Sequence, residues 1–113
     1  MLKAYVIGPY RADSDFKVDM NIQRAKEVAA RLWGLGYAVF CPHTNSAHFS
    51  GAAPEENFLK GNLEWLYQAD IAVVLANYID SKGSVMEIAF CETYNIKLFF
   101  LGFDLPKTWT EIE

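Results

Sequence analysis

The sequence predicts a single α/β domain in which a parallel sheet is covered by helices on both faces. Short apolar segments alternate with segments in which apolar residues recur every three or four positions, giving the order β-α-β-α-β-α-β. Residues 71–75, "IAVVL", form an uninterrupted apolar run, which is typical of a central parallel strand. Alternating strands and helices favour one parallel sheet, here of four to five strands. The length of 113 residues suits one domain that spans residues 1–113.

The first half of the chain predicts two strands separated by a helix. Residues 3–7, "KAYVI", are short, apolar and β-prone, and a Gly-Pro pair ends them. A polar loop follows, after which helical spacing of the apolar residues begins at Asn21 and ends at two nearby glycines. Residues 37–40, "YAVF", are the second strand. The loop at residues 41–54 is of a length that is usually functional or disordered.

The second half predicts two more helices and two more strands. Pro54, which two glutamates follow, suits the first turn of a helix, because proline lacks only an unpaired N–H there and acids suit the positive helix end. This helix continues to residue 68 and precedes the apolar strand. A third helix is expected over residues 84–93 and a fourth strand over residues 97–101, whereas the tail, 102–113, is ambiguous.

Composition and charge narrow the classes of function. Hydrophobic residues make up 52% of the chain, as expected of a packed globule. The net charge of −4 argues against a general nucleic-acid or membrane-surface binder, since such proteins usually need a basic face. The sequence has no apolar run near the ~20 residues that span a bilayer, and no signal peptide is expected because the first predicted strand starts almost at Met1. Cys41 and Cys91 lack metal-binding spacing and are expected to be reduced thiols of a cytoplasmic protein.

Polar residues that follow the predicted strands are the first candidates for a site, because open α/β sheets bind ligands beyond the carboxyl ends of their strands. After the first strand, Gly8 allows the backbone to approach a ligand closely, and Tyr10 and Arg11 can face the cleft. The arginine offers a planar fork to a phosphate or a carboxylate. The alternative interpretation is an ordinary β-turn with an exposed arginine.

The long loop contains residues that raise the question of a metal. Cys41, His43 and His48 match no standard zinc spacing and lack a fourth ligand, so no metal site is expected. His43 is interpreted either as a hydrogen-bonding cleft residue or as a simple loop residue, and His48 as a structural or exposed residue. Asn45, in the same loop, is a candidate for substrate binding.

Asn62 departs from the pattern of the second predicted helix. It lies four residues after Phe58 and four before Leu66, on the apolar side of the helix. A buried amide must find hydrogen-bond partners. Asn62 is therefore expected either to bond neighbouring backbone or to look into the cleft.

Glu87, near the start of the last predicted helix, has two interpretations. Ser84 and Glu87 fit the S-x-x-E capping box, in which the glutamate side chain folds back onto the N–H of the cap residue. Alternatively, a helix amino end favours the ionised carboxylate, which can act as a nucleophile or stabilise a developing cation. Ser81 and Ser84, with nearby helix N–H groups such as that of Gly83, could hold an anion beside it.

Four stretches of the chain together resemble the nucleoside 2-deoxyribosyltransferase-like superfamily. In order, they are "YVIGPYRA", "NIQRAKEVAARLWGLGYAVFCPHTNSAHF", "FLKGNLEWLYQADIAVVLANY" and "SKGSVMEIAF", and they cover residues 3 to about 100. The chain is most similar to a small branch that is common in phage and bacterial genomes and related to deoxynucleoside monophosphate N-glycosidases. The resemblance implies a Rossmann-like (flavodoxin-like) three-layer domain that forms a homodimer or a larger homo-oligomer. The aromatic content also hints at self-association, through Trp33, Trp65, Phe90 and Trp109, and which of these are core and which interface stays open at this point.

The resemblance also implies a reaction and a small-molecule nucleoside or nucleotide as the partner. Relatives cleave N-glycosidic bonds of deoxynucleosides or their monophosphates through a glutamate nucleophile and a covalent glycosyl-enzyme, and the matching residue here is Glu87. Tyr10 matches a tyrosine near the sugar, and Ser81 matches the serine with which the nucleotide hydrolases bind phosphate. Relatives carry an aspartate in the middle motif. The nearest position in this chain is Asn62, with Glu64 two residues later, and an amide cannot give up a proton at neutral pH.

Three hypotheses for the function remain open. The first is an N-glycosidase or deoxyribosyltransferase, which needs no metal or redox cofactor; the sequence accordingly has no GxGxxG motif and no Walker loop. The second is a module that binds a nucleotide without turning it over, and Asn62 motivates it. The third is a structural oligomer in which Glu87 only caps a helix.

Overall fold

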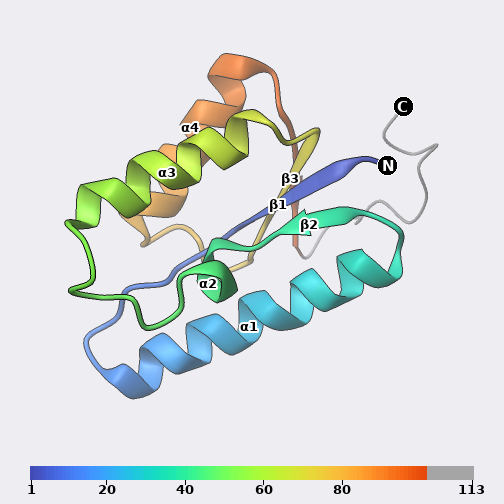
Figure 1. Cartoon of the computed structure of the whole chain (residues 1–113). Coiled ribbons are helices and arrows are strands. Elements are labelled where there is room, and N and C mark those ends of the chain that lie inside the picture. The colour runs from blue at the N-terminus through green and yellow to red at the C-terminus, as the bar shows by residue number, and fades with distance from the viewer. Residues whose placement is uncertain (102–113) are drawn as a thin grey trace.

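The computed structural model describes residues 1–101, which form a four-stranded sheet between two helical layers (Figure 1). In chain order the elements are β1 (Lys3–Ile7), α1 (Asp15–Gly34), β2 (Ala38–Phe40), α2 (Pro42–Asn45), α3 (Glu55–Tyr67), β3 (Ile71–Val74), α4 (Lys82–Tyr94) and β4 (Lys97–Phe100). The tail, 102–113, including Trp109, lies outside the described residues. Within residues 1–101, no helix is both long and apolar enough to cross a membrane.

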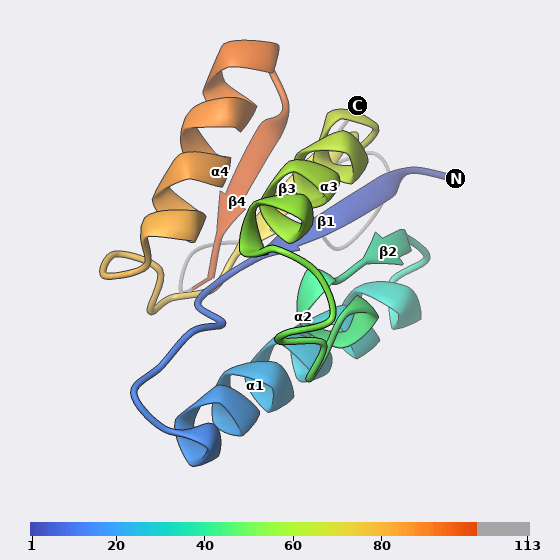
Figure 2. The same ribbon diagram turned by 60° about the vertical axis from the view of Figure 1, so that its left-hand side comes forward.

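The sheet is parallel throughout and has the strand order β2-β1-β3-β4. β1 is a central strand, with Lys3 opposite Ala38 of β2 and Ile7 opposite Val74 of β3. α1 covers one face of the sheet, and α3 and α4 cover the other (Figures 1 and 2). This order is that of a flavodoxin-like sheet with four strands. The predicted three-layer α/β fold is therefore confirmed.

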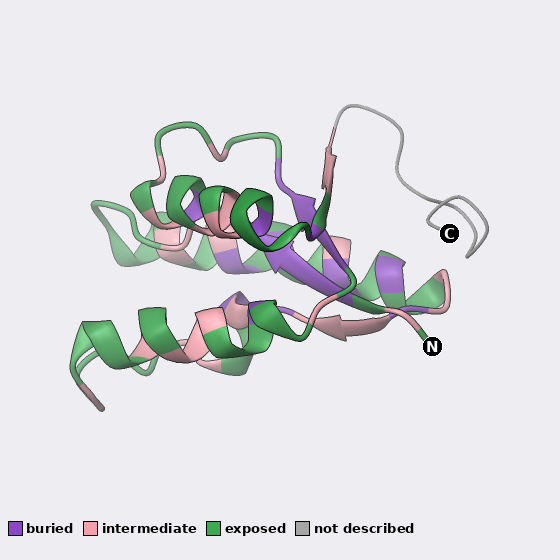
Figure 3. Ribbon diagram, turned by 90° about the horizontal axis from the view of Figure 1, so that it is seen from above, coloured by how far each residue is buried: buried purple, intermediate pink, exposed green. Residues whose placement is uncertain are grey.

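The side chains of β1 contribute to two separate cores, because successive residues of a strand point to opposite faces of the sheet. Ala4 and Val6 pack against the apolar stripe of α1. Tyr5 and Ile7 pack on the other face, together with apolar residues of α3 and α4. Figure 3 shows β1 and β3 buried and the outer sides of the helices exposed. Cover on both faces explains the uninterrupted apolar run of β3.

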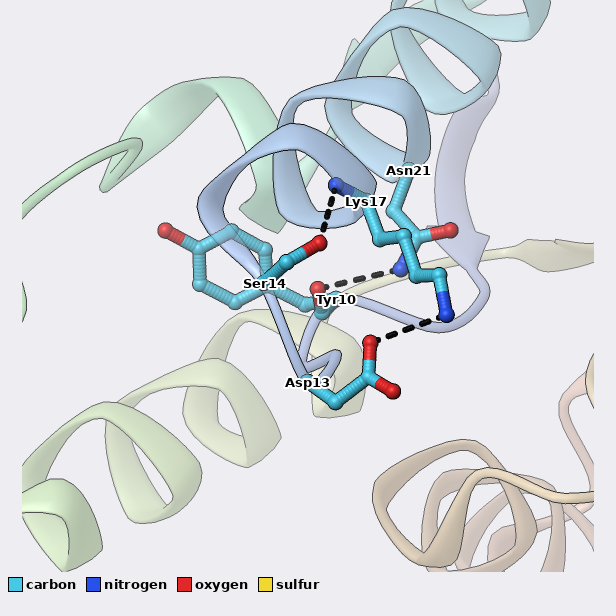
Figure 4. Close-up of polar contacts among 5 residues, drawn as sticks. All are labelled: Tyr10, Asp13, Ser14, Lys17 and Asn21. Atoms are coloured by element: carbon cyan, nitrogen blue, oxygen red, sulfur yellow. Dashed lines mark hydrogen bonds and ion pairs between the residues drawn. The ribbon is translucent and has the colours of Figure 1, made fainter.

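α1 begins at Asp15, one and a half turns before the predicted start at Asn21. Ser14 caps it, since its Oγ accepts a hydrogen bond from the Lys17 N–H at 3.2 Å, and Asp13 pairs with the Lys17 ammonium at 2.9 Å (Figure 4). The predicted polar loop over residues 15–20 is therefore wrong. These first turns are largely exposed, so apolar spacing does not mark them as helical.

Two further boundaries differ from prediction. α2 is a short helix inside the predicted long loop, and Pro42 occupies its first position. α4 begins at Lys82, because Ser81 is its cap and the Ser81 Oγ accepts a hydrogen bond from the Ser84 N–H at 3.2 Å. Ser84 is thus the third residue of the helix. The capping-box interpretation of Ser84 and Glu87 is wrong, because the cap lies nearly one turn earlier.

Candidate active site

The loops that follow β1 and β3 leave the sheet side by side at its carboxyl edge. The two strands pair as far as Ile7 and Val74, and the Leu75 N–H donates to the Ile7 carbonyl at 2.8 Å. This pairing brings to one edge the segment that carries Tyr10 and the segment that carries Ser81. The edge is the place where doubly wound sheets bind ligands.

Gly8 is the point where the first loop passes closest to β3. A Cβ atom at this position would lie 2.1 Å from Leu75 Cδ1, closer than any real contact. A larger residue would force the Leu75 side chain to move, so the packing of the neighbouring strand ends favours glycine there. Its predicted close approach to a ligand stays a prediction.

His43, on α2, anchors the same loop from the side. It is buried, and its Nε2 lies 3.0 Å from the Gly8 carbonyl oxygen and 3.1 Å from that of Pro9. Because carbonyl oxygens only accept hydrogen bonds, Nε2 carries the proton and donates it to them. Burial lowers the pKa of His43, so the ring is neutral at physiological pH. His43 is hydrogen-bonded as one interpretation expected, but its partners are the two backbone carbonyls and, at Nδ1, the Cys41 thiol at 3.9 Å.

Tyr10 connects the first loop to α1 and to the long loop. Its hydroxyl accepts a hydrogen bond from the His48 N–H at 3.1 Å, and its carbonyl accepts one from Asn21 Nδ2 at 3.1 Å (Figure 4). His48 is exposed and lies 3.2 Å from Asp19, which fits its predicted structural or exposed role. The sugar contact expected of Tyr10 stays a prediction.

Arg11 and Asn45 lie at the periphery of this edge. The Arg11 guanidinium pairs with the Glu55 carboxylate at 2.9 Å, which connects the first loop to the amino end of α3. Both side chains are exposed, so the other N–H groups of the guanidinium remain available to an anion. Asn45, the last residue of α2, is exposed. Substrate binding by these two residues stays a prediction.

Glu87 lies in the second turn of α4, and its side chain is directed at the sheet. The Tyr5 hydroxyl donates a hydrogen bond to Glu87 Oε2. Tyr5 is fully buried in β1, whereas Glu87 is half-buried. The carboxylate is therefore not folded back onto the backbone of its own helix. It is instead held by the side chain of Tyr5, which comes from the central strand β1.

Tyr5 is not among the site residues predicted from the sequence. The signal for it is the one hydroxyl in the strand "KAYVI", because a buried tyrosine usually finds a partner for its O–H. The ring stacks on Phe40 of β2, with centroids 5.7 Å apart, and Phe40 in turn stacks on Trp65 of α3 at 5.2 Å. This aromatic column fixes the direction of the Tyr5 hydroxyl.

The surroundings of Glu87 raise its pKa to near neutral pH. Burial raises the pKa of Glu87 from 4.5 to about 7, although the hydrogen bond from Tyr5 acts in the opposite direction. Burial and the neighbouring Glu87 charge raise the pKa of Tyr5, which therefore remains a protonated donor. Burial also raises the pKa of the Cys91 thiol, one turn further along α4, to about 12. Perturbed carboxylates of this kind are common at functional sites.

The amino end of α4 lies just before Glu87 and can accept an anion. The first N–H groups of a helix have no partner within it, and their partial positive charge favours anions. The space where a side chain of Gly83 would lie is open. The Ser84 hydroxyl, in contrast, is buried and has no hydrogen-bond partner among residues 1–101. Ser81 and Gly83 are half-buried and thus more open to solvent than Ser84 is.

Comparison with models of known protein families identifies the family of this chain. The family model described as "Domain of unknown function (DUF4406)" matches residues 2–100. The chain belongs to the DUF4406 family. A search of curated proteins gave no significant match.

Solved structures show that this DUF4406 domain has a nucleoside 2-deoxyribosyltransferase-like fold. The chain is similar to the 2-deoxyribosyltransferase from the psychrotolerant bacterium Bacillus psychrosaccharolyticus, with a TM-score of 0.68 and 19% identity, over 92% of this chain and 77% of that one. It is also similar to a 2-deoxyribosyltransferase from Leishmania mexicana, with a TM-score of 0.65 and 18% identity, over 88% of this chain and 63% of that one. The predicted resemblance is thus confirmed at the level of the fold.

Asn62 of the DUF4406 domain lies half-buried on α3. Its side chain makes no hydrogen bond to another residue in the range 1–101, so the expectation that it bonds neighbouring backbone is wrong. The amide remains free for a ligand or for water. Glu64, two residues later, is exposed.

A hollow of about 280 Å³ at the carboxyl edge lies between the ends of β3 and β4. Its lining is mostly apolar and consists of Leu75, Ala76, Tyr78, Phe100 and Leu101. A second hollow, of about 430 Å³, lies on the outer side of α1 around Phe16 and Met20. Glu87 lines neither of these hollows. The hollow that the acid was expected to face is therefore not formed around the Glu87 carboxylate in this structure, where its hydrogen-bond partner is Tyr5.

Proposed function

We propose that this protein cleaves or transfers the N-glycosidic bond of a nucleoside or nucleoside monophosphate, with Glu87 as the nucleophile. The observation that carries the proposal is the Glu87 carboxylate, which is half-buried, held by the Tyr5 hydroxyl and not used as a helix cap. The shared fold with two 2-deoxyribosyltransferases supports the reaction class. A carboxylate positioned on a fold of this kind is the group that such a reaction needs.

In the proposed reaction, Glu87 Oε1 attacks the anomeric carbon of the sugar. The bond from this carbon to the base nitrogen breaks, and its electron pair leaves with the base. Tyr5 donates to Oε2, which leaves Oε1 available for the attack. The negative carboxylate also stabilises the cation-like sugar of the transition state. Water or a second base then attacks the same carbon and releases Glu87, which makes the protein a hydrolase or a transferase.

The departing base needs a proton, and the described residues limit its source. Asn62 cannot supply one at neutral pH. His43 is poorly suited, because its Nε2–H already donates to two carbonyl groups and its pKa is lowered. We infer that solvent supplies the proton. Bases that leave easily, with little need for protonation, are therefore the substrates that fit this site best.

The residues around Glu87 are proposed to hold the sugar and its 5′ substituent. Ser81, Gly83 and the free N–H groups of α4 suit a 5′-hydroxyl or a 5′-phosphate, and Arg11 can add a charge-assisted contact to a phosphate. The buried Ser84 side chain packs on the inner side of this end of α4. Tyr10 is proposed to border the sugar. Gly8, His43, Asn45 and Asn62 complete the binding edge.

A second candidate is a module that binds a nucleotide without turnover. The observation that favours it is Asn62, an uncharged amide without a described partner, where an acid would assist the departure of the base. Such a module would keep the fold and the anion-binding helix end but would release no base.

The test is a panel of nucleosides and nucleoside 5′-monophosphates, incubated with the protein and assayed by chromatography for free base. Glu87→Ala is the control, with circular dichroism to confirm that it folds. We expect the wild type to release base from at least one compound and Glu87→Ala to release none. Full turnover by Glu87→Ala contradicts the proposal. Tight binding by calorimetry without base release from any compound favours the second candidate.

A further inference from the structure

His48, in the loop between α2 and α3, has an uncommon backbone conformation. Its φ is 62°, in the left-handed region that glycine adopts freely and that other residues adopt at a cost. Its side chain is 66% exposed, so packing in a core does not impose this conformation. Backbone strain persists only where the surrounding contacts hold it, and it is concentrated at functional sites. The contacts of His48 therefore indicate what the conformation serves.

Two contacts hold His48, one through its backbone and one through its side chain. The His48 N–H donates to the Tyr10 hydroxyl at 3.1 Å. The imidazole Nε2 lies 3.2 Å from Oδ1 of Asp19, in the second turn of α1. Because a carboxylate only accepts hydrogen bonds, Nε2 carries a proton and donates it, whether the ring is neutral or charged. The side chain thus fastens the loop to α1 while the backbone reaches Tyr10.

Tyr10 is held at three points. Its carbonyl accepts a hydrogen bond from Asn21 Nδ2 at 3.1 Å (Figure 4), and its ring lies edge-on to the His43 ring at 6.1 Å. The third point is the hydroxyl, which accepts from His48. Within residues 1–101 the Tyr10 O–H donates to no group. Its oxygen is therefore fixed in place while its proton is available to an acceptor atom of a ligand.

We propose that His48 is a positioning residue, whose left-handed backbone fixes the Tyr10 hydroxyl as a hydrogen-bond donor toward the ligand. The inference rests on the proposed function, in which Tyr10 borders the sugar. The role is indirect, because His48 acts through Tyr10. A hydroxyl that is already fixed loses less conformational freedom when a ligand binds, so the effect of His48 falls on substrate affinity.

The first test measures hydrogen exchange of the residue-48 amide by NMR in the wild type and in Tyr10→Phe. This readout needs no substrate, so it separates the contact from the proposed reaction. Tyr10→Phe removes the acceptor and leaves the sequence around residue 48 unchanged. We expect this amide to exchange about 3- to 10-fold faster in Tyr10→Phe, the factor that one hydrogen bond provides. An unchanged rate would overturn the proposal.

The second test compares KM and kcat for base release between two variants of His48. His48→Ala disfavours the left-handed backbone, whereas His48→Gly adopts it freely. Both lose the contact with Asp19, so their difference isolates the backbone. We expect KM to rise about 3- to 10-fold in His48→Ala with kcat nearly unchanged, and to stay closer to the wild-type value in His48→Gly. An equal KM in the two variants would contradict the role of the backbone.

A double variant shows whether His48 acts through Tyr10. In a Tyr10→Phe background, His48→Ala should raise KM no further, because the two changes break the same contact. A full additional rise would mean that His48 acts by another route, and would overturn the proposal.

Asn95 provides the matched control, because it is the one other non-glycine residue with a positive φ, 60°, within residues 1–101. It caps the carboxyl end of α4, just before β4, and so lies at the opposite edge of the sheet. Asn95→Ala should lower the melting temperature and leave KM unchanged. A rise in KM equal to that of His48→Ala would identify the effect as general backbone strain, against the proposal.

Failure of the proposed function gives a different result. If the wild type releases no base from any compound, the proposed reaction is wrong, and the affinity for nucleoside 5′-monophosphates by calorimetry takes the place of KM in the same comparison. Weaker binding by His48→Ala than by His48→Gly would then support the positioning role. Equal binding, or no binding by the wild type, would overturn it.

Discussion

Glu87 holds a position that ordinary packing does not favour. The carboxylate is half-buried over an apolar face of the sheet, and its pKa of about 7 means that removal from water opposes its ionised form. The described partner is a single neutral hydroxyl, from Tyr5, and not a cation. A charged group kept in such a place at a cost in stability is typical of active sites.

The first prediction concerns the stability of Glu87→Gln. Between pH 4.5, the pKa of an ordinary glutamate, and about 7, folded Glu87 binds more protons than unfolded Glu87, so the free energy of unfolding of the wild type falls as the pH rises. Glu87→Gln has no carboxyl group to ionise, so its free energy of unfolding does not fall with pH for this reason. We expect it to be more stable than the wild type by about 1 to 3 kcal/mol at pH 8, with the difference closing toward pH 4.5. Urea denaturation at both pH values measures it. A variant that is less stable than the wild type at pH 8 would indicate a structural role for Glu87.

The second prediction concerns the hydrogen bond from Tyr5. This bond lowers the pKa of Glu87, so its removal in Tyr5→Phe raises that pKa further. Because attack requires the ionised carboxylate, base release should increase with pH around 7 in the wild type, and the increase should move up by about one pH unit in Tyr5→Phe. The pH dependence of kcat/KM measures the shift. Tyr94→Phe, which removes an exposed hydroxyl, should leave the profile unchanged, and an unchanged profile in Tyr5→Phe would exclude the proposed coupling.

At the scale of the elements, the start of α4 determines where Glu87 points. With Ser81 as the cap, Glu87 falls in the second turn, on the side that faces β1. With Ser84 as the cap, it would fall in the first turn and bond its own backbone. The position of one serine thus decides whether Glu87 caps its own helix or faces Tyr5 of β1.

The third prediction tests this boundary with two serine substitutions. Ser81→Ala removes the cap and should lower the free energy of unfolding by about 1 kcal/mol. Ser84→Ala removes a buried hydroxyl that has no partner within residues 1–101, so it should be neutral or stabilising by up to about 1 kcal/mol. Denaturant titration of both variants provides the comparison. If Ser84→Ala were destabilising and Ser81→Ala were not, Ser84 would be the cap of α4 after all.

The fourth prediction concerns the contact between the ends of β1 and β3. Gly8→Ala places a methyl group against Leu75 and should cost about 1 to 3 kcal/mol of stability. The loss should shrink when Leu75→Ala is added, relative to the sum of the two single losses, because the second change removes the clash. Gly61→Ala is the matched control: no atom outside α3 lies near its added methyl group, so it should stabilise the helix by about 0.5 to 1 kcal/mol. Additive losses at Gly8 and Leu75 would contradict the contact.

Sequence patterns predicted the elements well where burial is regular and poorly where it is not. β3 is buried on both faces, so its apolar run marked it clearly. The first turns of α1 are largely exposed and α2 has only four residues, so apolar spacing gave no signal there, although Ser14 and Pro42 are local signals of a helix start.

At the scale of the molecule, the alternation of strands and helices was enough to predict the fold, because few topologies suit such an order. The site was less predictable. Glu87 was predicted as a site residue from the stretch "SKGSVMEIAF". Its partner Tyr5 lies 82 residues away in the sequence, and the two meet only because the sheet and α4 pack together. Long-range pairs of this kind leave no local pattern, so the contact between Tyr5 and Glu87 could be found only in the structure.

The most direct test of the central claim, that Glu87 attacks the sugar, is intact-protein and peptide mass spectrometry after rapid acid quench of the protein with a substrate from the panel. The account predicts a wild-type adduct with the mass of the sugar, located on the α4 peptide at Glu87, and no adduct in Glu87→Gln. Base release without any adduct, or base release by Glu87→Gln at the wild-type rate, would contradict it.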